Sequence, residues 1–150
     1  MRYFIYSIIG IVALSVVAGF FIVGSPKEER ARKQDDQRVQ HLQFIQSEII
    51  NYWVNKEKLP ETLSLIEDSI RGILVPKDPE SGADYEYKII DAKELKFALC
   101  ADFNLLSLEL QSSRAPKAVE PYFTEQNWTH TAGMVCFERT IDRDFYRKRS

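Results

Sequence analysis

Few residues of this 150-residue chain could do chemistry. Its two cysteines are Cys100 and Cys136, and its two histidines are His41 and His130. A cysteine nucleophile needs a base within hydrogen-bonding reach, so Cys136 with His130 is the first pair to consider. Residues six positions apart on one strand do not normally touch, and this pair would require the chain to fold back on itself. The sequence therefore gives catalysis little support.

A metal site is the second chemistry that these residue types allow. Cys100, Cys136 and His130 could supply three ligands, with His41 or an aspartate as the fourth. Zinc ligands usually come in pairs at short spacing, which these residues do not show. The chain also lacks a nucleophile-elbow serine pattern, a glycine-rich phosphate loop and a zinc-protease pattern. We therefore predict a non-enzymatic protein with no metal and no cofactor.

A disulfide between the two cysteines is the third possibility. Cys100 alternates with Leu99 in one run that is typical of a strand, and Cys136 alternates with Val135 in another. If these strands pair, both sulfur atoms face the same side of the sheet. The bond would close a loop of about 37 residues, stabilise the fold by ~4 kcal/mol and require an oxidising compartment. The alternative is a pair of buried free thiols.

Asp78 and Glu80 are the remaining candidates, an acid pair inside the segment "VPKDPESGADYEY" at residues 75–87. Two prolines exclude a continuous helix there, and a Ser-Gly pair is typical of a turn. Acidic residues in turns usually bond the local backbone or face solvent. We therefore interpret the segment as a turn that leads into a strand rather than as a catalytic loop.

The elements that must position these residues follow from periodicity. Residues 35–56 carry apolar side chains at steps of three and four, which predicts an amphipathic helix. Residues 85–89 and 95–103 alternate between polar and apolar side chains, which predicts an antiparallel hairpin, and residues 133–141 predict a third strand. Residues 104–126 show no period and predict a long surface loop. The fold class is therefore α+β, with the long helix packed on a small antiparallel sheet of three or four strands.

The first 24 residues predict a transmembrane anchor. Residues 3–23 contain no charge, and 21 helical residues cover about 30 Å, the thickness of a bilayer core. Basic residues within 27–33 would keep the following domain in the cytoplasm, whereas a disulfide would place it outside. The predicted organisation is an anchor at 1–24, a charged juxtamembrane segment at 25–34, the α+β domain at 35–142 and a basic tail at 143–150.

The order of several short motifs carries a family resemblance. "LP..L" is followed by "P.DP.SG..Y.Y" and then by a strand that ends in "LCADF". This order resembles the soluble domain of type II secretion major pseudopilins and other type IV pilin-like proteins. The matching residues are Leu59, Pro60, Leu63, Pro76, Asp78, Pro79, Gly82, Tyr85 and Tyr87. The resemblance implies that a helix covers a small sheet and that both tyrosines pack on the helix. The chain departs from pilins in having no acidic residue inside its apolar segment.

The function that follows is structural. A net charge of −2 and the absence of a basic stripe predict no nucleic-acid partner. The resemblance implies a membrane-anchored, pseudopilin-like module in a secretion-like or envelope assembly, placed in the bacterial inner membrane with its domain outside the cytoplasm. Its partners would be the membrane and other pilin-like subunits or envelope proteins. The alternative is a stand-alone envelope domain that binds a small ligand or peptide.

Overall fold

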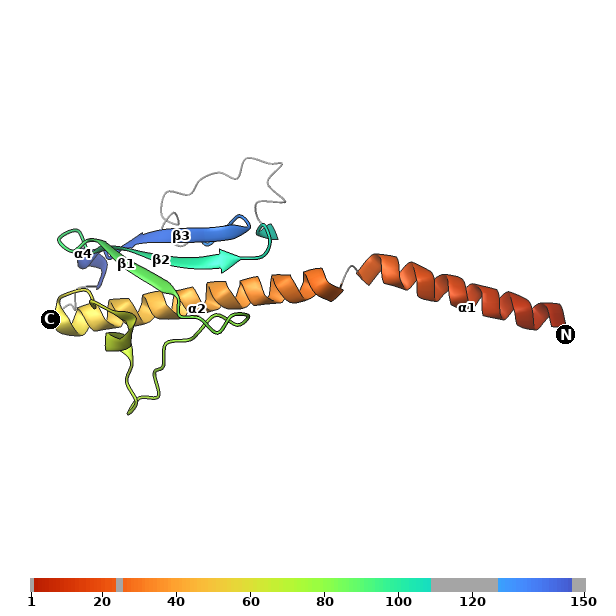
Figure 1. The fold of residues 1–150 in the computed structure, drawn as a ribbon, viewed down its shortest axis with the longest axis horizontal. Coiled ribbons are helices and arrows are strands. Elements are labelled where there is room, and N and C mark those ends of the chain that lie inside the picture. Colours follow the sequence, from red (N-terminus) through yellow and green to blue (C-terminus); the bar gives the residue numbers. More distant parts are fainter. Residues whose placement is uncertain (1, 24–25, 109–126, 147–150) are drawn as a thin grey trace. The chain divides into compact units, whose positions relative to one another are not determined.

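The structure is a computed structural model that describes residues 2–23, 26–108 and 127–146 (Figure 1). In chain order its elements are α1 (Arg2–Val23), α2 (Pro26–Lys56), the 3-10 turn η1 (Leu63–Ile66), β1 (Glu86–Asp91), β2 (Lys96–Phe103), β3 (Gly133–Thr140) and α4 (Arg143–Tyr146). The chain divides into two compact units, Met1–Lys33 and Gln34–Ser150. Each unit is described by itself.

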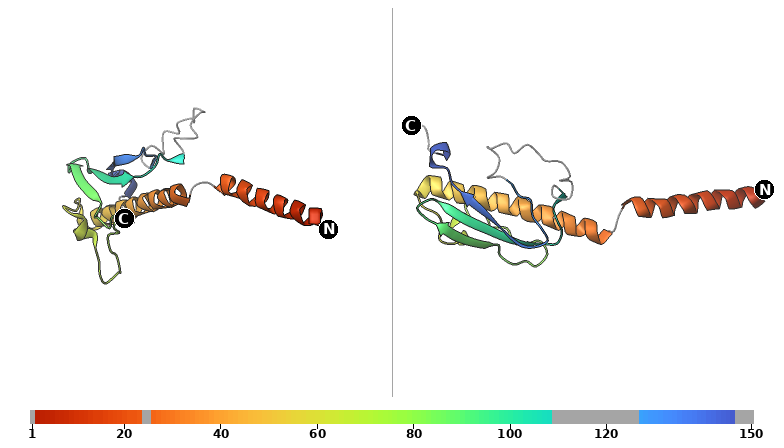
Figure 2. Two further views of the ribbon diagram at one scale, coloured as in Figure 1. Left: turned by 45° about the vertical axis from the view of Figure 1, so that its right-hand side comes forward. Right: turned by 90° about the horizontal axis from the view of Figure 1, so that it is seen from above.

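The second unit is a helix packed on a sheet, and it has the α+β class that the sequence predicts. Its three strands are antiparallel in the order β1-β2-β3, and Leu99 of β2 pairs with Tyr87 on one side and Phe137 on the other. Two views show the strands lying along one side of α2 (Figure 2). The sheet shows three strands in the described part of the chain, and the turn before β2 is fixed by the Asp91 carboxylate, which accepts backbone N–H groups.

The core forms where one stripe of α2 meets the middle strand. Leu42, Ile45 and Ile49 are fully buried, and they belong to the same cluster as Phe97 and Leu99 of β2. Because apolar residues at steps of three and four share one helix face, and alternate residues of a strand share one sheet face, these two patterns pack together. The opposite face of β2 carries Ala98 and Cys100 between Lys96 and Asp102.

The first helix corrects the membrane prediction. In the part of the chain that the structure describes, no helix is both long enough and apolar enough to cross a membrane. The predictions of a transmembrane anchor at 1–24, of a single-pass membrane protein and of an inner-membrane location are therefore wrong.

Other boundaries shift by smaller amounts. The amphipathic helix expected at 35–56 is the carboxyl-terminal part of α2, which starts at Pro26, a residue that suits the first helical turn, and α2 takes in most of the segment expected at 25–34. Most of the loop expected at 104–126 lies outside the described residues, as does the end of the tail expected at 143–150. The described beginning of that tail, Arg143–Tyr146, is a short helix.

Candidate functional site

Arg38, a buried arginine on α2, lies at the centre of a group of ion pairs in the second unit. Its Nε donates to Asp78 Oδ2 at 2.5 Å, and its Nη2 donates to Asp78 Oδ1 at 3.2 Å and to Glu80 Oε2 at 2.9 Å. Its Nη1 donates to Asp35 Oδ1 at 2.8 Å. A planar guanidinium matches a carboxylate with two parallel hydrogen bonds, so Asp78 is held in orientation as well as in place. We call these four residues the Arg38 cluster.

Asp78 also builds the turn in which it lies. Its Oδ1 accepts the backbone N–H of Glu80 at 3.0 Å and of Ser81 at 2.8 Å, and the Ser81 hydroxyl at 3.0 Å. The N–H of Gly82 donates to the Asp78 carbonyl at 2.9 Å, and Gly82 has a φ of 69°, which glycine adopts without strain. The acid pair expected from the sequence therefore shapes a loop and binds it to α2.

The Arg38 cluster reaches a third segment, the loop that follows β2. Asp35 Oδ1 and Oδ2 accept the backbone N–H groups of Asn104 at 2.9 Å and Leu105 at 2.8 Å. The Asn104 amide donates to Glu80 Oε2 at 2.9 Å. Two loops far apart in the sequence are thus fixed to one turn of α2 by charged groups, and the carboxylates of the cluster are occupied as acceptors.

The ionisation of the cluster follows from these contacts. Burial alone would raise the pKa of Asp78, but the hydrogen bonds from Arg38 and from the Ser81 and Glu80 N–H groups outweigh it and hold that pKa well below its usual value. Burial would likewise lower the pKa of Arg38, and its carboxylate partners raise it above the normal range. Hydrogen bonds from Asn104 and Arg38 lower the pKa of Glu80. These directions keep Arg38, Asp78 and Glu80 charged at neutral pH, which suits ion pairs that hold the loop in place.

The two tyrosines of the motif contact elements on either side of this loop. The Tyr85 hydroxyl lies 2.8 Å from His41 Nδ1 of α2, and the Tyr87 hydroxyl donates to the Pro60 carbonyl at 2.9 Å. Burial raises the pKa of both, that of Tyr87 to about 12. Leu59 is buried beside them. Among the other motif residues, the structure places Leu63 in η1, and Pro76 and Pro79 flank Asp78 in the loop.

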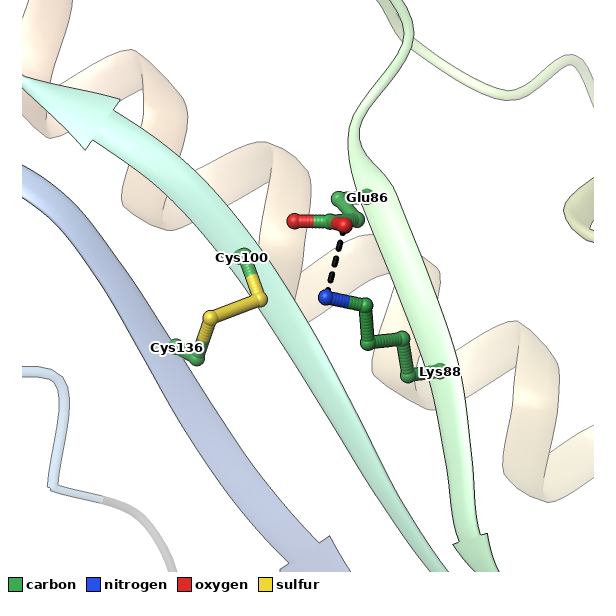
Figure 3. The surroundings of a disulfide bond; sticks show 4 residues. All are labelled: Glu86, Lys88, Cys100 and Cys136. Carbon is green, nitrogen blue, oxygen red and sulfur yellow. Dashed lines mark ion pairs between the residues drawn. A yellow bond between two sulfur atoms is a disulfide. The ribbon is translucent and has the colours of Figure 1, made fainter.

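The two cysteines form a disulfide across β2 and β3 (Figure 3). The Cα atoms of Cys100 and Cys136 lie 4.0 Å apart, on the sheet face away from α2. Glu86 stands opposite Cys100 on β1, and its carboxylate pairs with Lys88 Nζ at 2.8 Å. Glu86 and the two sulfur atoms lie close enough to share a metal ion, within 4.8 Å of one another, but both sulfurs are bonded to each other. The two cysteines therefore form a covalent link between β2 and β3 and not a pair of metal ligands.

His130 lies on the other side of the sheet. Its ring stacks on Phe103 with centroids 3.8 Å apart, and its backbone exchanges hydrogen bonds with Ser107. Phe103 faces α2 and Cys136 faces away from it, so the structure does not bring together the nucleophile and base considered from the sequence. His130 Nδ1 is buried without a hydrogen-bond partner.

A second buried arginine, which sequence reasoning did not identify as a contact centre, holds residues 127 and 128 before β3. Arg139 of β3 lies 4.2 Å over the Trp128 ring, and its Nε and Nη2 donate to Gln46 Oε1 at 3.1 Å and to the Asn127 carbonyl at 2.8 Å. A guanidinium over an aromatic face is attractive. The arginine therefore fixes the residues before β3 to the sheet and to α2.

Arg38 and Asp35 were missed as well, although the sequence holds a signal for them. The buried residues of α2 are Asp35, Arg38, Leu42, Ile45 and Ile49, at steps of three and four. The charged pair thus continues the apolar stripe toward the start of the helix. Charges on a buried stripe indicate partners elsewhere in the chain, because an unpaired buried charge is costly.

Comparison with protein families, with curated proteins and with solved structures finds no match to this chain. The resemblance to pseudopilins therefore remains a prediction, and a role in type II secretion gains no support from a known family.

Proposed function

We propose that this chain is a non-enzymatic structural module that assembles with copies of itself or with similar subunits through its first helix. The larger structure would be of the secretion-like or envelope kind that the motif order implies. The observation that carries the proposal is the surface of α1. Among its described side chains, Tyr3 is 89% exposed and Leu14 is 75% exposed, and none of residues 3–15 is charged.

An uncharged helix that exposes apolar side chains on every side favours burial against another surface. A helix that is apolar all round is normally buried, whereas a solvent-facing helix has one polar face. Exposed residues of α1 include Tyr3, Phe4, Ile5 and Tyr6, which follow one another at steps of about 100° and so cover all sides of the helix. The same helix from another copy offers a surface of the same chemistry, with no charge that would have to lose its hydration.

The second unit supports a structural role because its polar groups are used for its own fold. The carboxylates of the Arg38 cluster accept hydrogen bonds from one arginine and from two loops, and both thiols are in a disulfide. An enzyme would need at least one such group poised to act on a substrate. A rigid domain joined to an assembling helix needs none.

Sedimentation velocity of the full chain tests the proposal. We expect oligomers for the native sequence and for Ile90→Lys, and a shift toward monomer for Ile8→Lys. Ile8 and Ile90 are both 46% exposed, so the two variants introduce the same charge at equally exposed sites on different elements. A lysine in an apolar contact has to lose its hydration, and a weakening of association by tenfold corresponds to only about 1.4 kcal/mol.

A native chain that stays monomeric at its highest soluble concentration would overturn the proposal. Equal effects of the two lysines would do so too, because association would then not depend on α1. Circular dichroism of the three proteins shows whether each is folded.

A further inference from the structure

The loop between η1 and β1 holds one isoleucine fully in solvent on a fixed turn. Asp68 and Ile73 exchange two backbone hydrogen bonds of 2.9 and 2.8 Å, and Asp68 Oδ1 accepts the N–H of Ile70 at 2.9 Å. Gly72 has a φ of 70°, which lets the chain reverse. Ile70 is 99% exposed at the end of this turn. Residues 68–73 are called the Ile70 turn below.

The apolar character extends beyond this residue. Leu65 and Leu74 on the same segment are also exposed, and Arg71 follows Ile70 directly. One exposed apolar side chain is ordinary, but Ile70 on the turn is accompanied by Leu65 in η1 before it and Leu74 directly after it, and exposed apolar side chains in one segment can mark a contact surface. Because the turn is already held by hydrogen bonds, little conformational entropy is lost when it binds.

A pocket lies at the carboxyl end of α2. Its volume is about 650 Å³, within the ordinary range of binding sites. The apolar part of its lining includes Trp53, Val54, Leu95 and Tyr146, contributed by α2, by the residue before β2 and by α4. Its charged lining residues are Glu57, Asp144 and Arg143, and the Arg143 guanidinium is already bound to the Lys93 carbonyl.

Two residues with a left-handed backbone also line this pocket. Glu57 has a φ of 58° and Leu95 has a φ of 53°, and within the described ranges they are the only residues other than glycine with positive φ. Both line the pocket. Side-chain-bearing residues avoid this conformation, and where it persists it often serves a binding site.

We propose that the Ile70 turn of one copy docks in this pocket of the next copy. Ile70 would enter the apolar part, and Arg71 would lie between the carboxylates of Glu57 and Asp144. The pocket has two acidic groups against one arginine that is already bonded, which favours a cationic neighbour of the docked isoleucine. This inference rests on the proposed function, since it supplies a second contact between assembled copies.

The position of the two surfaces indicates how copies would repeat. The loop that holds the Ile70 turn extends from one side of α2, and α4, which lines the pocket, lies on the other side (Figures 1 and 2). A turn and a pocket on opposite sides make a head-to-tail contact, and such contacts generate rings or open rows of subunits. One turn in one pocket is a small interface, so its occupancy depends on the high local concentration that α1 association provides.

Chemical cross-linking of full-length variants tests the contact. Both native cysteines are in the disulfide, so an added cysteine is the only free thiol. A Ser69→Cys chain is mixed with an Ala92→Cys chain and treated with a short bis-maleimide. Ser69 lies in the Ile70 turn, and Ala92 is an exposed residue of the pocket lining. The control partner is Gln40→Cys, exposed on α2 about 20 Å along the helix from Val54.

We expect the Ser69–Ala92 product to exceed the Ser69–Gln40 product by about tenfold, the ratio for a modest binding preference. Adding Ile70→Asp to the Ser69→Cys chain should remove that excess, whereas Ile90→Asp should leave it. Equal yields with the two partners, or an excess that survives Ile70→Asp, would overturn the inference. Sedimentation of the same samples separates the two proposals: oligomers without the Ser69–Ala92 excess refute only the docking contact, and monomers refute the proposed function as well.

Discussion

Asp78→Asn isolates the charge of the Arg38 cluster with little change of shape. In the native chain the Asp78 carboxylate bonds Arg38 at 2.5 and 3.2 Å, and the Arg38 side chain is only 4% exposed. Asparagine keeps an oxygen that accepts from the turn N–H groups, but it removes the negative charge. The substitution therefore leaves a buried guanidinium with one fewer counter-charge.

The size of the effect can be worked from these contacts. Removing one partner of a buried ion pair costs about 3–5 kcal/mol, because the remaining charge is uncompensated. Arg38 retains Asp35 at 2.8 Å and Glu80 at 2.9 Å, so part of the compensation survives. We therefore expect Asp78→Asn to lower the free energy of unfolding by about 2–3 kcal/mol, below the full cost of an unpaired charge.

Urea unfolding of the full chain, followed by tryptophan fluorescence, measures this difference. The matched control is Asp84→Asn, since Asp84 is 75% exposed and pairs with Lys77 at 3.2 Å on the surface. Exposed ion pairs contribute less than about 1 kcal/mol, and so should this one. If Asp78→Asn costs no more than Asp84→Asn, the cluster does not hold the loop to α2, and our interpretation of the "VPKDPESGADYEY" segment is wrong.

Three further predictions follow from the same structure. Folding lowers the pKa of Asp78, so the Asp78 carboxylate stabilises the folded state fully above its unfolded pKa of about 3.9, and this stabilisation is lost as pH falls toward the folded pKa. Urea midpoints measured across acidic pH should show this loss in the native chain and a smaller loss in Asp78→Asn. Replacing Cys100 and Cys136 together by alanine should lower the free energy of unfolding by about 4 kcal/mol, because the disulfide closes a loop with a sequence separation of 36. The native chain should lose the same free energy when it is unfolded in a dithiol reductant. Tyr87→Phe should cost about 1 kcal/mol by removing the bond to the Pro60 carbonyl, and an unchanged urea midpoint would show that water replaces that bond.

Local patterns in the sequence predict much of the second unit. Apolar residues recur at every third or fourth position in α2 and at every second position in β2 and β3. The first spacing predicts a helix and the second a strand, and each also predicts which side chains face the core. The parity of Cys100 and Cys136 even places both sulfurs on one sheet face, where the structure bonds them. These inferences work because neighbours in sequence share one geometry.

Such local patterns could not predict the Arg38 cluster, because its residues are far apart in the sequence. Arg38 and Asp78 are 40 residues apart in the sequence, and they come into contact only because the loop before β1 passes beside α2. Periodicity assigns a charged residue to solvent by default, so Asp35 and Arg38 were left out of the predicted stripe although they continue its spacing. The membrane prediction, which was based on the uncharged residues 3–23, is contradicted because no helix in the described part of the chain is long and apolar enough to cross a membrane.

The buried charges and the disulfide have a common consequence for how the second unit responds to force. The Arg38 cluster fixes two loops to the first turns of α2 in that unit, and the disulfide fixes β3 to β2, so strong contacts link the helix to the loops and one strand to the next. A subunit in an assembly is pulled at its contact surfaces, and a domain held only by apolar packing can shear there. Charged groups satisfied by several partners resist such motion because any displacement leaves a buried charge unpaired. In the assembly proposed above, these contacts would hold the two loops and β3 in place when the subunit is pulled.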